Sequence, residues 1–393
     1  MRTMQNKLQK CLLVLGLVIL TGCNNSKTKE SVFAETAQSY CESNTLKNRY
    51  VVQWEDGSIT VETTDTHISD DHFRETFVKD NLALIKHVDR DFEIKLRQAT
   101  SSDVHTEATN LSWGPERMVA DQVWAQGYKG QGIKVGVVDG MVDATHVQLA
   151  GNVISTEQFN NEVNDPNLNI HGTHVAGIIA ADPNLGPVGG VAPSAKIIAG
   201  QFISNAGGGS LGDAILAMNS VANKGARIIN MSWGGAGCVT ALKDAIQALS
   251  NRGILIVTAA GNDGVNSDYS PDYPAAFRLE NQINVAATTI DDRFISFSNR
   301  GVHTVNVGAP GVSIYSTIPG NRVDDMDGTS MAAPMVSGAA ALLMSALPAA
   351  TAQQIKQAIY TSVDFYPEYQ VSTHGRVNVK KALDALRAML TSP

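Results

Sequence analysis

The sequence predicts an α/β domain in which a mostly parallel sheet is covered by helices on both faces, giving three layers. Two patterns beyond residue 113 support this fold class. Short, continuously apolar runs predict buried strands at 133–138, 196–201, 227–231, 254–259 and 282–287. Helical patterns lie among them, at 118–126, 171–181, 211–223 and 239–251. Because parallel strands need long crossover connections, this alternation favours a single sheet with helices on both sides.

The composition limits the class of protein. A chain of 393 residues can form one large domain and a smaller one. A net charge of -8, with no Lys/Arg run beyond the extreme N-terminus, argues against a nucleic-acid partner. The spacing of the cysteines fits no metal-binding knuckle, and no disulfide framework is expected because two of them lie in the leader. The four are Cys11, Cys23, Cys41 and Cys238, the last without an assigned role.

The N-terminus has the pattern of an export signal. Basic residues precede an apolar run at 11–20, which is too short to span a bilayer. Leu20-Thr-Gly-Cys23 is similar to a bacterial lipobox, so we expect a signal peptide over 1–22 and acylation of Cys23. An ordinary signal peptide with a chance cysteine is the alternative. With 23–45 as a tether, the precursor is expected in the bacterial cell envelope, lipid-anchored and facing the periplasm or exterior. A secreted mature form, released from this anchor, is expected alongside it.

Residues 46–98 predict a small α+β domain. Alternating apolar residues indicate strands, and Ser69-Asp-Asp71 provides a helix N-cap with an acidic first turn. The expected elements are strands at 49–54 and 59–62, a helix at 70–80, and two strands near 82–88 and 92–96 joined by Asp89-Arg-Asp91. Polar residues 99–112 form a linker and the expected processing region before the main domain, 113–393.

The stretch Gly328-Thr-Ser-Met-Ala-Ala-Pro334 predicts a nucleophile at the start of a buried helix. From Ser330 to Leu347 almost every residue is small or apolar. Pro334 is tolerated if it lies where helical N–H groups have no partner. Free N–H groups and the helix dipole beside Ser330 would favour a developing negative charge. The alternative is a serine N-cap on a tightly packed helix.

Polar residues follow the predicted strands at the edge where ligands bind in such sheets. Asp139 ends a buried strand, so its carboxylate needs a partner. A histidine held by that carboxylate, His171, could take a proton from Ser330. The amide of Asn262 could face an oxyanion. Alternatively Asp139 caps a turn, Asn262 is a turn residue, and His171 with His174 binds a metal, although no third ligand has a recognisable spacing.

Together these stretches resemble the subtilisin-like serine proteases (subtilases), from about Trp113 to Leu386. The motifs occur in that family's order: Val135-Gly-Val-Val-Asp139, His171-Gly-Thr-His-Val-Ala-Gly177, Gly189-Gly-Val-Ala-Pro193, Asn230-Met-Ser232, Ala260-Gly-Asn262 and Gly328 to Pro334. The resemblance implies a serine endopeptidase that works through an acyl-enzyme. It implies that Ser330 attacks the peptide carbonyl, His171 moves the proton and Asp139 orients His171. Asn262 and the Ser330 N–H would bind the oxyanion.

The resemblance also indicates substrate-binding residues. Gly207, Gly208, Ser232, Trp233 and Gly234 occupy the positions of the two walls that flank an extended peptide. Trp233 would narrow the pocket, with core packing as the alternative. Asp272 falls at the base of the primary pocket, where a carboxylate would favour Lys or Arg before the cleaved bond. A solvated loop charge is the alternative for Asp272.

Some positions depart from the family pattern. Gly140-Met141 stand where a hydroxyl residue and glycine are usual, which leaves the local turn open. Gln148 stands where an aspartate often contributes to a structural calcium site, although Asn184 could still serve. Calcium binding is therefore unresolved, and no cofactor is needed for the chemistry. Asp324, Asp325 and Asp327 predict a solvated acidic loop, with an ion site as the alternative.

The unit at 46–98 stands where subtilases carry a propeptide, which assists folding and blocks the cleft until it is cut away. The expected partners are protein or peptide substrates, this propeptide as an intramolecular inhibitor, and a membrane through Cys23. The working unit is expected to be a monomer. Cutting at 99–112 would separate the catalytic domain from its lipid anchor. The rival interpretation is a non-catalytic lipoprotein that keeps the fold as a binding scaffold.

Overall fold

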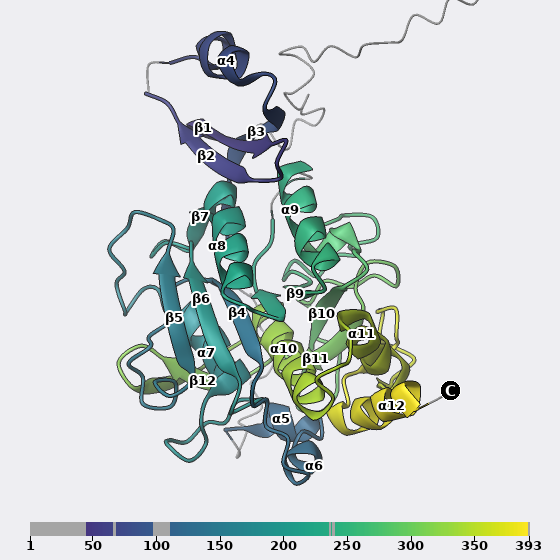
Figure 1. Cartoon of the computed structure of the whole chain (residues 1–393). Helices are drawn as coiled ribbons and strands as arrows, with labels where there is room; N and C mark the ends of the chain where they lie inside the picture. The colour runs from purple at the N-terminus through teal and green to yellow at the C-terminus, as the bar shows by residue number, and fades with distance from the viewer. Residues whose placement is uncertain (1–44, 66–67, 97–110, 236, 238–239, 392–393) are drawn as a thin grey trace, which may run out of the picture.

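The computed structural model describes residues 45–391, except 66–67, 97–110, 236 and 238–239 (Figure 1). The predicted signal peptide, Cys23, Cys41, most of the expected processing region and Cys238 lie outside the described residues.

A nine-stranded, mostly parallel sheet forms the centre of the main domain (Figure 1). Its order is β14-β15-β11-β10-β9-β8-β4-β6-β5. All neighbours pair in parallel except β14 with β15, which are antiparallel. The strands are β4 (Lys134–Asp139), β5 (Val153–Gln158), β6 (Lys196–Gln201), β8 (Ile228–Met231), β9 (Leu255–Ala259), β10 (Gln282–Thr288), β11 (Val307–Pro310), β14 (Asp364–Phe365) and β15 (Gly375–Arg376). The predicted fold class is confirmed.

Helices cover both faces of this sheet. One apolar core joins a face of the sheet to α7 and α10, and a second joins the other face to α8 and α9. The helices are α7 (His171–Ala180), α8 (Leu211–Asn223), α9 (Thr240–Asn251), α10 (Thr329–Ala346), α11 (Ala352–Thr361) and α12 (Val379–Thr391). The predicted helix at 118–126 is wrong: two short helices occur instead, α5 (Trp113–Arg117) and α6 (Asp121–Trp124). Between them Val119 has φ +60°, a left-handed conformation that no continuous helix accepts.

The central helix α10 is almost wholly buried. Among the described residues it is the one helix long and apolar enough to cross a membrane, yet 83% of that stretch is covered by protein. Pro334 is not in the first turn, as the sequence suggested, but is the sixth residue of the helix. Its missing N–H leaves the carbonyl of Ser330 without an intrahelical donor. The Ser232 hydroxyl donates to that carbonyl at 2.8 Å.

A small α+β unit precedes the main domain and lies against α8 and α9 (Figure 1). Its elements are β1 (Thr45–Trp54), β2 (Ile59–Thr63), the continuous helical segments α3 (Asp70–Phe73), η1 (Arg74–Val78) and α4 (Lys79–Asn81), and β3 (Ile85–Lys95). Stacked Tyr50 and Phe73 rings, with centroids 3.9 Å apart, lie in its separate core.

The two strands expected near 82–88 and 92–96 are one strand, β3. Asp89 and Asp91 lie within this strand and do not form a turn. Both carboxylates are buried against the main domain. Asp89 accepts a hydrogen bond from the N–H of Ala241 at 2.9 Å, and Asp91 accepts one from the N–H of Gly212 at 2.8 Å. Those N–H groups belong to the first turns of α9 and α8, where helices lack internal acceptors.

Candidate active site

Asp139 and His171 form a hydrogen-bonded pair at the carboxyl edge of the sheet. Asp139 is the last residue of β4 and is fully buried. His171 is the first residue of α7, and its Nδ1–H donates to Oδ1 of Asp139 at 2.7 Å. With Nδ1 protonated in this way, a neutral imidazole leaves Nε2 as a proton acceptor. The structure therefore brings together the predicted carboxylate and imidazole in the tautomer that a general base needs.

Ser330 is the second residue of α10 and is 9% exposed. Its hydroxyl donates to the carbonyl of Ser232 at 2.9 Å, while the Ser232 hydroxyl donates back to the carbonyl of Ser330. Among the described residues, no hydrogen bond joins Ser330 to His171. The hydroxyl is thus held against the end of β8 instead of the imidazole, an orientation common before substrate binds.

A buried polar chain fixes the end of β8 to α10. The side-chain amide of Asn230 donates to the Ser232 hydroxyl at 2.9 Å, and the Ser337 hydroxyl donates to Oδ1 of Asn230 at 2.9 Å. Sequence reasoning missed Ser337. The available signal was its spacing: Ser337 follows Ser330 by two helical turns, which puts both hydroxyls on one face.

Asn262 and the N–H of Ser330 point at the same small space. Oδ1 of Asn262 accepts from the N–H and hydroxyl of Thr329 at 2.9 and 2.8 Å, which directs Nδ2 the other way. A Cβ atom added to Gly328 would lie 3.3 Å from Nδ2 of Asn262 and 3.5 Å from the N of Ser330. Gly328 has φ +151° and leaves this space open. Two donors beside a nucleophile are the arrangement that stabilises an oxyanion.

A narrow pocket adjoins Ser330 and holds several of the predicted substrate residues. Ser232, Trp233, Gly234, Asn262 and Asp272 line it together with Ala259, Gly261, Thr329 and Ser330. Asp272 is only 7% exposed, so the solvated loop charge does not describe it. The indole of Trp233 is 2% exposed and donates to the carbonyl of Val138 at 2.8 Å. The Trp233 side chain therefore packs in the core, where it supports the strand that carries Asp139.

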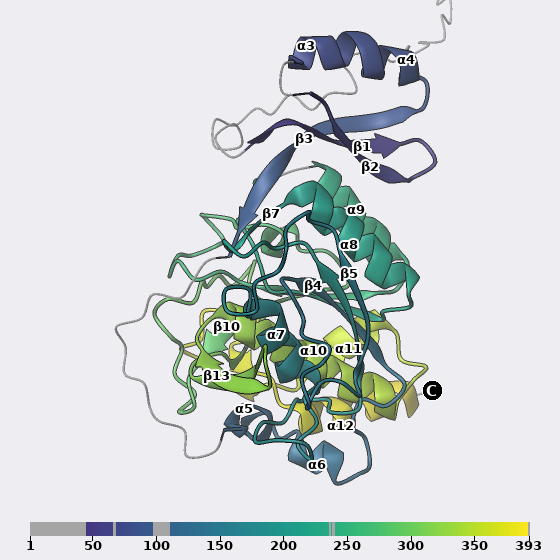
Figure 2. The same cartoon turned by 90° about the vertical axis from the view of Figure 1, so that its left-hand side faces the viewer.

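The end of β3 lies along the predicted substrate walls (Figure 2). It pairs antiparallel with β7 (Gly208–Ser210), where Ile94 faces Gly209 and Lys95 faces Gly208. The N–H of Leu96 then donates to the carbonyl of Gly207 at 2.7 Å. On its other side Lys95 forms an antiparallel bridge with Gly234. The last residues of β3 are thus extended and lie between both walls. A peptide substrate would bind between these walls in the same way.

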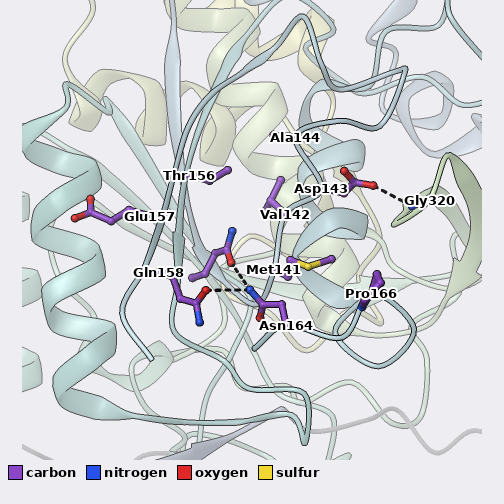
Figure 3. Close-up of a pocket in the computed structure, with 11 residues that line it drawn as sticks. Met141, Val142, Asp143, Ala144, Thr156, Glu157, Gln158, Asn164, Pro166 and Gly320 are labelled. Atoms are coloured by element: carbon purple, nitrogen blue, oxygen red, sulfur yellow. Dashed lines mark hydrogen bonds between the residues drawn. The ribbon is translucent and has the colours of Figure 1, made fainter. Parts of the chain in front are cut away.

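A larger, open cavity of about 620 Å³ lies beyond Asp139, beside Met141 and β5 (Figure 3). Most of its polar side chains are already hydrogen-bonded within the protein. Asn164 donates to Gln158 at 3.2 Å and to Gln201 at 3.0 Å, and Asp143 accepts from the N–H of Gly320 at 2.9 Å. We assign no chemistry to this cavity.

His174 does not join His171 at a metal site. Its ring is fully buried and its Nε2 bonds to the carbonyl of Asp324 at 3.1 Å. Burial lowers the pKa of His174 to about 3, which keeps the ring neutral.

The acidic cluster lies on and beside a β-hairpin. Asp324 and Asp325 lie on β13 (Arg322–Met326), which pairs with β12 (Ile314–Ile318), and Asp327 accepts a hydrogen bond from the N–H of Ser313. In the described part of the chain, no three His, Cys, Asp or Glu side chains form a metal-binding group.

Gln148 stands where the resemblance led us to expect an acidic calcium ligand, and its side chain acts as a hydrogen-bond donor. Its Nε2 donates to the carbonyls of Asp182 and Val188, at 3.0 and 2.5 Å. Asn184 turns its amide to Oδ1 of Asp182 at 2.8 Å. Carbonyls that face an amide N–H are already satisfied, and an N–H cannot ligate a cation. As arranged here, these residues do not fit calcium.

Comparisons with known proteins agree on one family. The model described as "Subtilase family" matches residues 130–384. Subtilisin DY of Bacillus licheniformis is 36% identical over 280 residues, covering 70% of this chain and 99% of that protein. Thermitase of Thermoactinomyces vulgaris is 38% identical over 278 residues, covering 70% and 96%. The crystal structure of fervidolysin from Fervidobacterium pennivorans, "a keratinolytic enzyme related to subtilisin", superposes with a TM-score of 0.74 at 25% identity. The match covers 90% of this chain and 62% of the fervidolysin chain.

Proposed function

The chain belongs to the subtilase family of serine endopeptidases, and we propose that Ser330 is the nucleophile that attacks the peptide bond. His171 acts as the general base and Asp139 orients it. The observation that carries this assignment is the 2.7 Å hydrogen bond from His171 to Asp139, which leaves Nε2 of His171 to accept a proton.

The reaction proceeds in two halves. When a substrate carbonyl enters, the Ser330 side chain rotates away from the Ser232 carbonyl and its proton passes to His171. The alkoxide bonds to the carbonyl carbon, and the Ser330 N–H and Nδ2 of Asn262 hold the resulting oxyanion. His171 then gives the proton to the leaving amine, which leaves an acyl-enzyme. Water, activated by His171, releases the new carboxylate and restores Ser330.

The small N-terminal unit is proposed to act as the chain's own inhibitor. The pairing of β3 with β7 and Gly234 supports this role, because the strand occupies the walls that a substrate would use. The proposed substrate contacts are Gly207, Gly208, Ser232, Gly234 and the pocket residue Asp272. All of these groups come from one chain, which supports a monomer as the working unit.

Peptide hydrolysis by the purified protein tests the assignment. A mixed peptide pool is incubated with the native chain, with Ser330→Ala and with Ser345→Ala, a serine at the far end of α10. Mass spectrometry is expected to find internal cleavage by the native and Ser345→Ala proteins, and none above background by Ser330→Ala. Equal cleavage by Ser330→Ala would assign the chemistry to another residue.

We further propose that the precursor is held on the cell envelope by lipid on Cys23. This rests on the lipobox-like sequence, because Cys23 lies outside the described residues. Cleavage after the small unit would then release a catalytic domain that carries no lipid. Fractionation is expected to find the full-length chain in membranes and a shorter form in the soluble fraction. Cys23→Ser should move the precursor out of the membranes, and finding only full-length protein there would contradict self-release.

A further inference from the structure

We propose that Asn169 is a positioning residue for the general base of this protease. Its carboxamide joins the segment that begins the His171 helix to the turn that follows Asp139, and so holds the imidazole against the carboxylate. The inference goes beyond the proposed function but rests on it, because His171 must be the base. Two separate observations carry it: the hydrogen bonds of the Asn169 side chain, and the space beside Gly140.

The Asn169 carboxamide is buried and joins three segments of the chain. The residue is 3% exposed and lies two positions before His171, which begins α7. Its Oδ1 accepts the N–H of Met141 at 3.1 Å, while its Nδ2 donates to the carbonyl of Ile203 at 2.9 Å and to Oδ1 of Asn164 at 3.3 Å. The oxygen and both N–H groups of the carboxamide are therefore used, which fixes it in one orientation.

Two of these partners adjoin Asp139. Met141 belongs to the turn after Asp139, in which the N–H of Gly140 donates to Oδ1 of Asp139 at 2.6 Å. The N–H of Ile203 donates to the main-chain carbonyl of Asp139 at 3.3 Å. Oδ1 also accepts the His171 bond, whereas Oδ2 is buried without a hydrogen-bond partner in the described part of the chain. The orientation of the carboxylate therefore depends on the turn that this carboxamide holds.

The second observation is that the carboxamide of Asn169 fills the space beside Gly140. A Cβ atom added to Gly140 would overlap Oδ1 of Asn169 and lie 3.2 Å from its Cγ. The φ of Gly140 lies outside the left-handed region, so this contact, and not the backbone, excludes a side chain there. The turn at Gly140-Met141, which the sequence left open, is thus completed by a side chain from the segment that precedes His171.

Asn169 acts on the reaction through other residues. It does not line the pocket beside Ser330. Loss of its carboxamide should let the Asp139–His171 pair shift relative to the Ser330 hydroxyl. A displacement of about 1 Å in such a pair costs up to about 100-fold in rate. The proton transfers should therefore slow, while the affinity for substrate stays the same.

Two substitutions displace the same carboxamide from opposite sides. Asn169→Ala removes it, and Gly140→Ala displaces it without a change at residue 169. The kcat and KM for a small peptide are measured with the processed native protein, both single variants, the double variant and Asn167→Ala, an exposed asparagine of the same loop. Active sites are counted by complete reaction with a fluorophosphonate, which labels activated serines. Incomplete folding or processing is then not mistaken for slow chemistry.

Each single substitution should lower kcat by about 10- to 100-fold and leave KM within about 2-fold of the native value. The double variant should be no slower than the slower single variant, because the carboxamide can be displaced only once. Asn167→Ala should match the native protein.

Three results would overturn the inference: an unchanged kcat in Asn169→Ala, a rise in KM in place of the fall in kcat, or losses that multiply in the double variant. These results leave the proposed function intact, because each is measured on cleavage by Ser330. Cleavage that persists in Ser330→Ala, or full turnover by His171→Ala, would instead overturn the proposed function itself.

Discussion

Pro334 deprives the carbonyl of Ser330 of its helical donor, and the Ser232 hydroxyl supplies the replacement. Removal of that hydroxyl leaves a buried acceptor unsatisfied and takes away the acceptor of the Asn230 amide, and each unsatisfied buried group costs about 1–3 kcal/mol. In the Ser330→Ala chain, which we propose is inactive and so cannot digest itself, we expect Ser232→Ala to lower the free energy of unfolding by at least this amount.

The companion variant Pro334→Ala makes this test specific. An alanine at 334 restores an N–H that can donate to the carbonyl of residue 330, so Ser232→Ala should cost markedly less in that background. Urea unfolding of the four proteins completes the double-mutant cycle. An equal cost of Ser232→Ala in both backgrounds would show that the two groups are not coupled.

His174 makes the fold sensitive to acid. Burial lowers its pKa from 6.5 to about 3, although its hydrogen bond to the carbonyl of Asp324 opposes the shift. Between pH 6.5 and 3, His174 is protonated in the unfolded chain but stays neutral in the folded chain. The stability from the neutral ring is therefore complete above pH 6.5, and is lost at about 1.4 kcal/mol per pH unit as the pH falls toward 3.

His174→Gln should flatten this pH dependence, even if it lowers stability at pH 7. Between pH 7 and 5 the variant is expected to lose about 2 kcal/mol less unfolding free energy than its parent, both in the Ser330→Ala background. Urea titrations at the two pH values measure the difference. A His174→Gln slope equal to the parent's would contradict the assignment.

In the connection between α7 and β6, the carbonyls of Asp182 and Val188 accept hydrogen bonds from the Gln148 amide and do not face a cation. We therefore expect a chelator to leave the melting temperature of the Ser330→Ala chain unchanged. Gln148→Glu has the same length but places a carboxylate against two carbonyls, which should lower the melting temperature by about 5 °C or more. Calcium should restore part of that loss in Gln148→Glu alone. A native chain that loses stability in chelator would contradict this reading of Gln148.

Strand β3 holds the small unit on the main domain through the first turns of two helices. Asp89 accepts from the N–H of Ala241 and Asp91 from the N–H of Gly212. A charge-assisted bond of this kind contributes about 1.5–3 kcal/mol. Asp89→Asn in the full chain should therefore weaken retention of the cleaved unit by about 10-fold or more.

Activity of the processed complex on a small peptide, measured across a dilution series, reports this retention. The matched control is Lys86→Ala, which removes the neighbouring ion pair with Asp244 at 3.0 Å. Both partners of that pair are substantially exposed, so its loss should change retention little. If Lys86→Ala and Asp89→Asn released the unit equally, the helix-terminus contact would not be what holds it.

At the scale of the whole molecule, the parts predicted well from the sequence are those with strong local patterns. Continuous apolar runs and the glycine-rich motifs indicated the central strands and the helices that bear His171 and Ser330. Strand β5 was missed because it lies at the sheet edge, where its residues alternate between half-buried and exposed. The short strands β7, β14 and β15 carry no periodic signal of their own.

Other features depend on contacts between distant segments, which no local pattern reveals. Asp89 and Asp91 indicated a turn, because the N–H groups that donate to their carboxylates belong to two helices of the other unit. Trp233 has the same sequence context whether it narrows a pocket or packs under Asp139. The orientation of Ser330 toward Ser232 likewise depends on two elements far apart in the chain. The sequence indicated which candidate side chains occur and in what order. It could not indicate which neighbour each of them contacts.

We propose that the fold as a whole serves to activate one hydroxyl, that of Ser330. A fluorophosphonate probe that reacts with activated serines tests this most directly, with the modified peptide located by mass spectrometry. After processing, the native protein should gain one adduct, on Ser330, and His171→Ala should label far more slowly. An adduct on another serine, or equal labelling of native and His171→Ala proteins, would contradict the assignment.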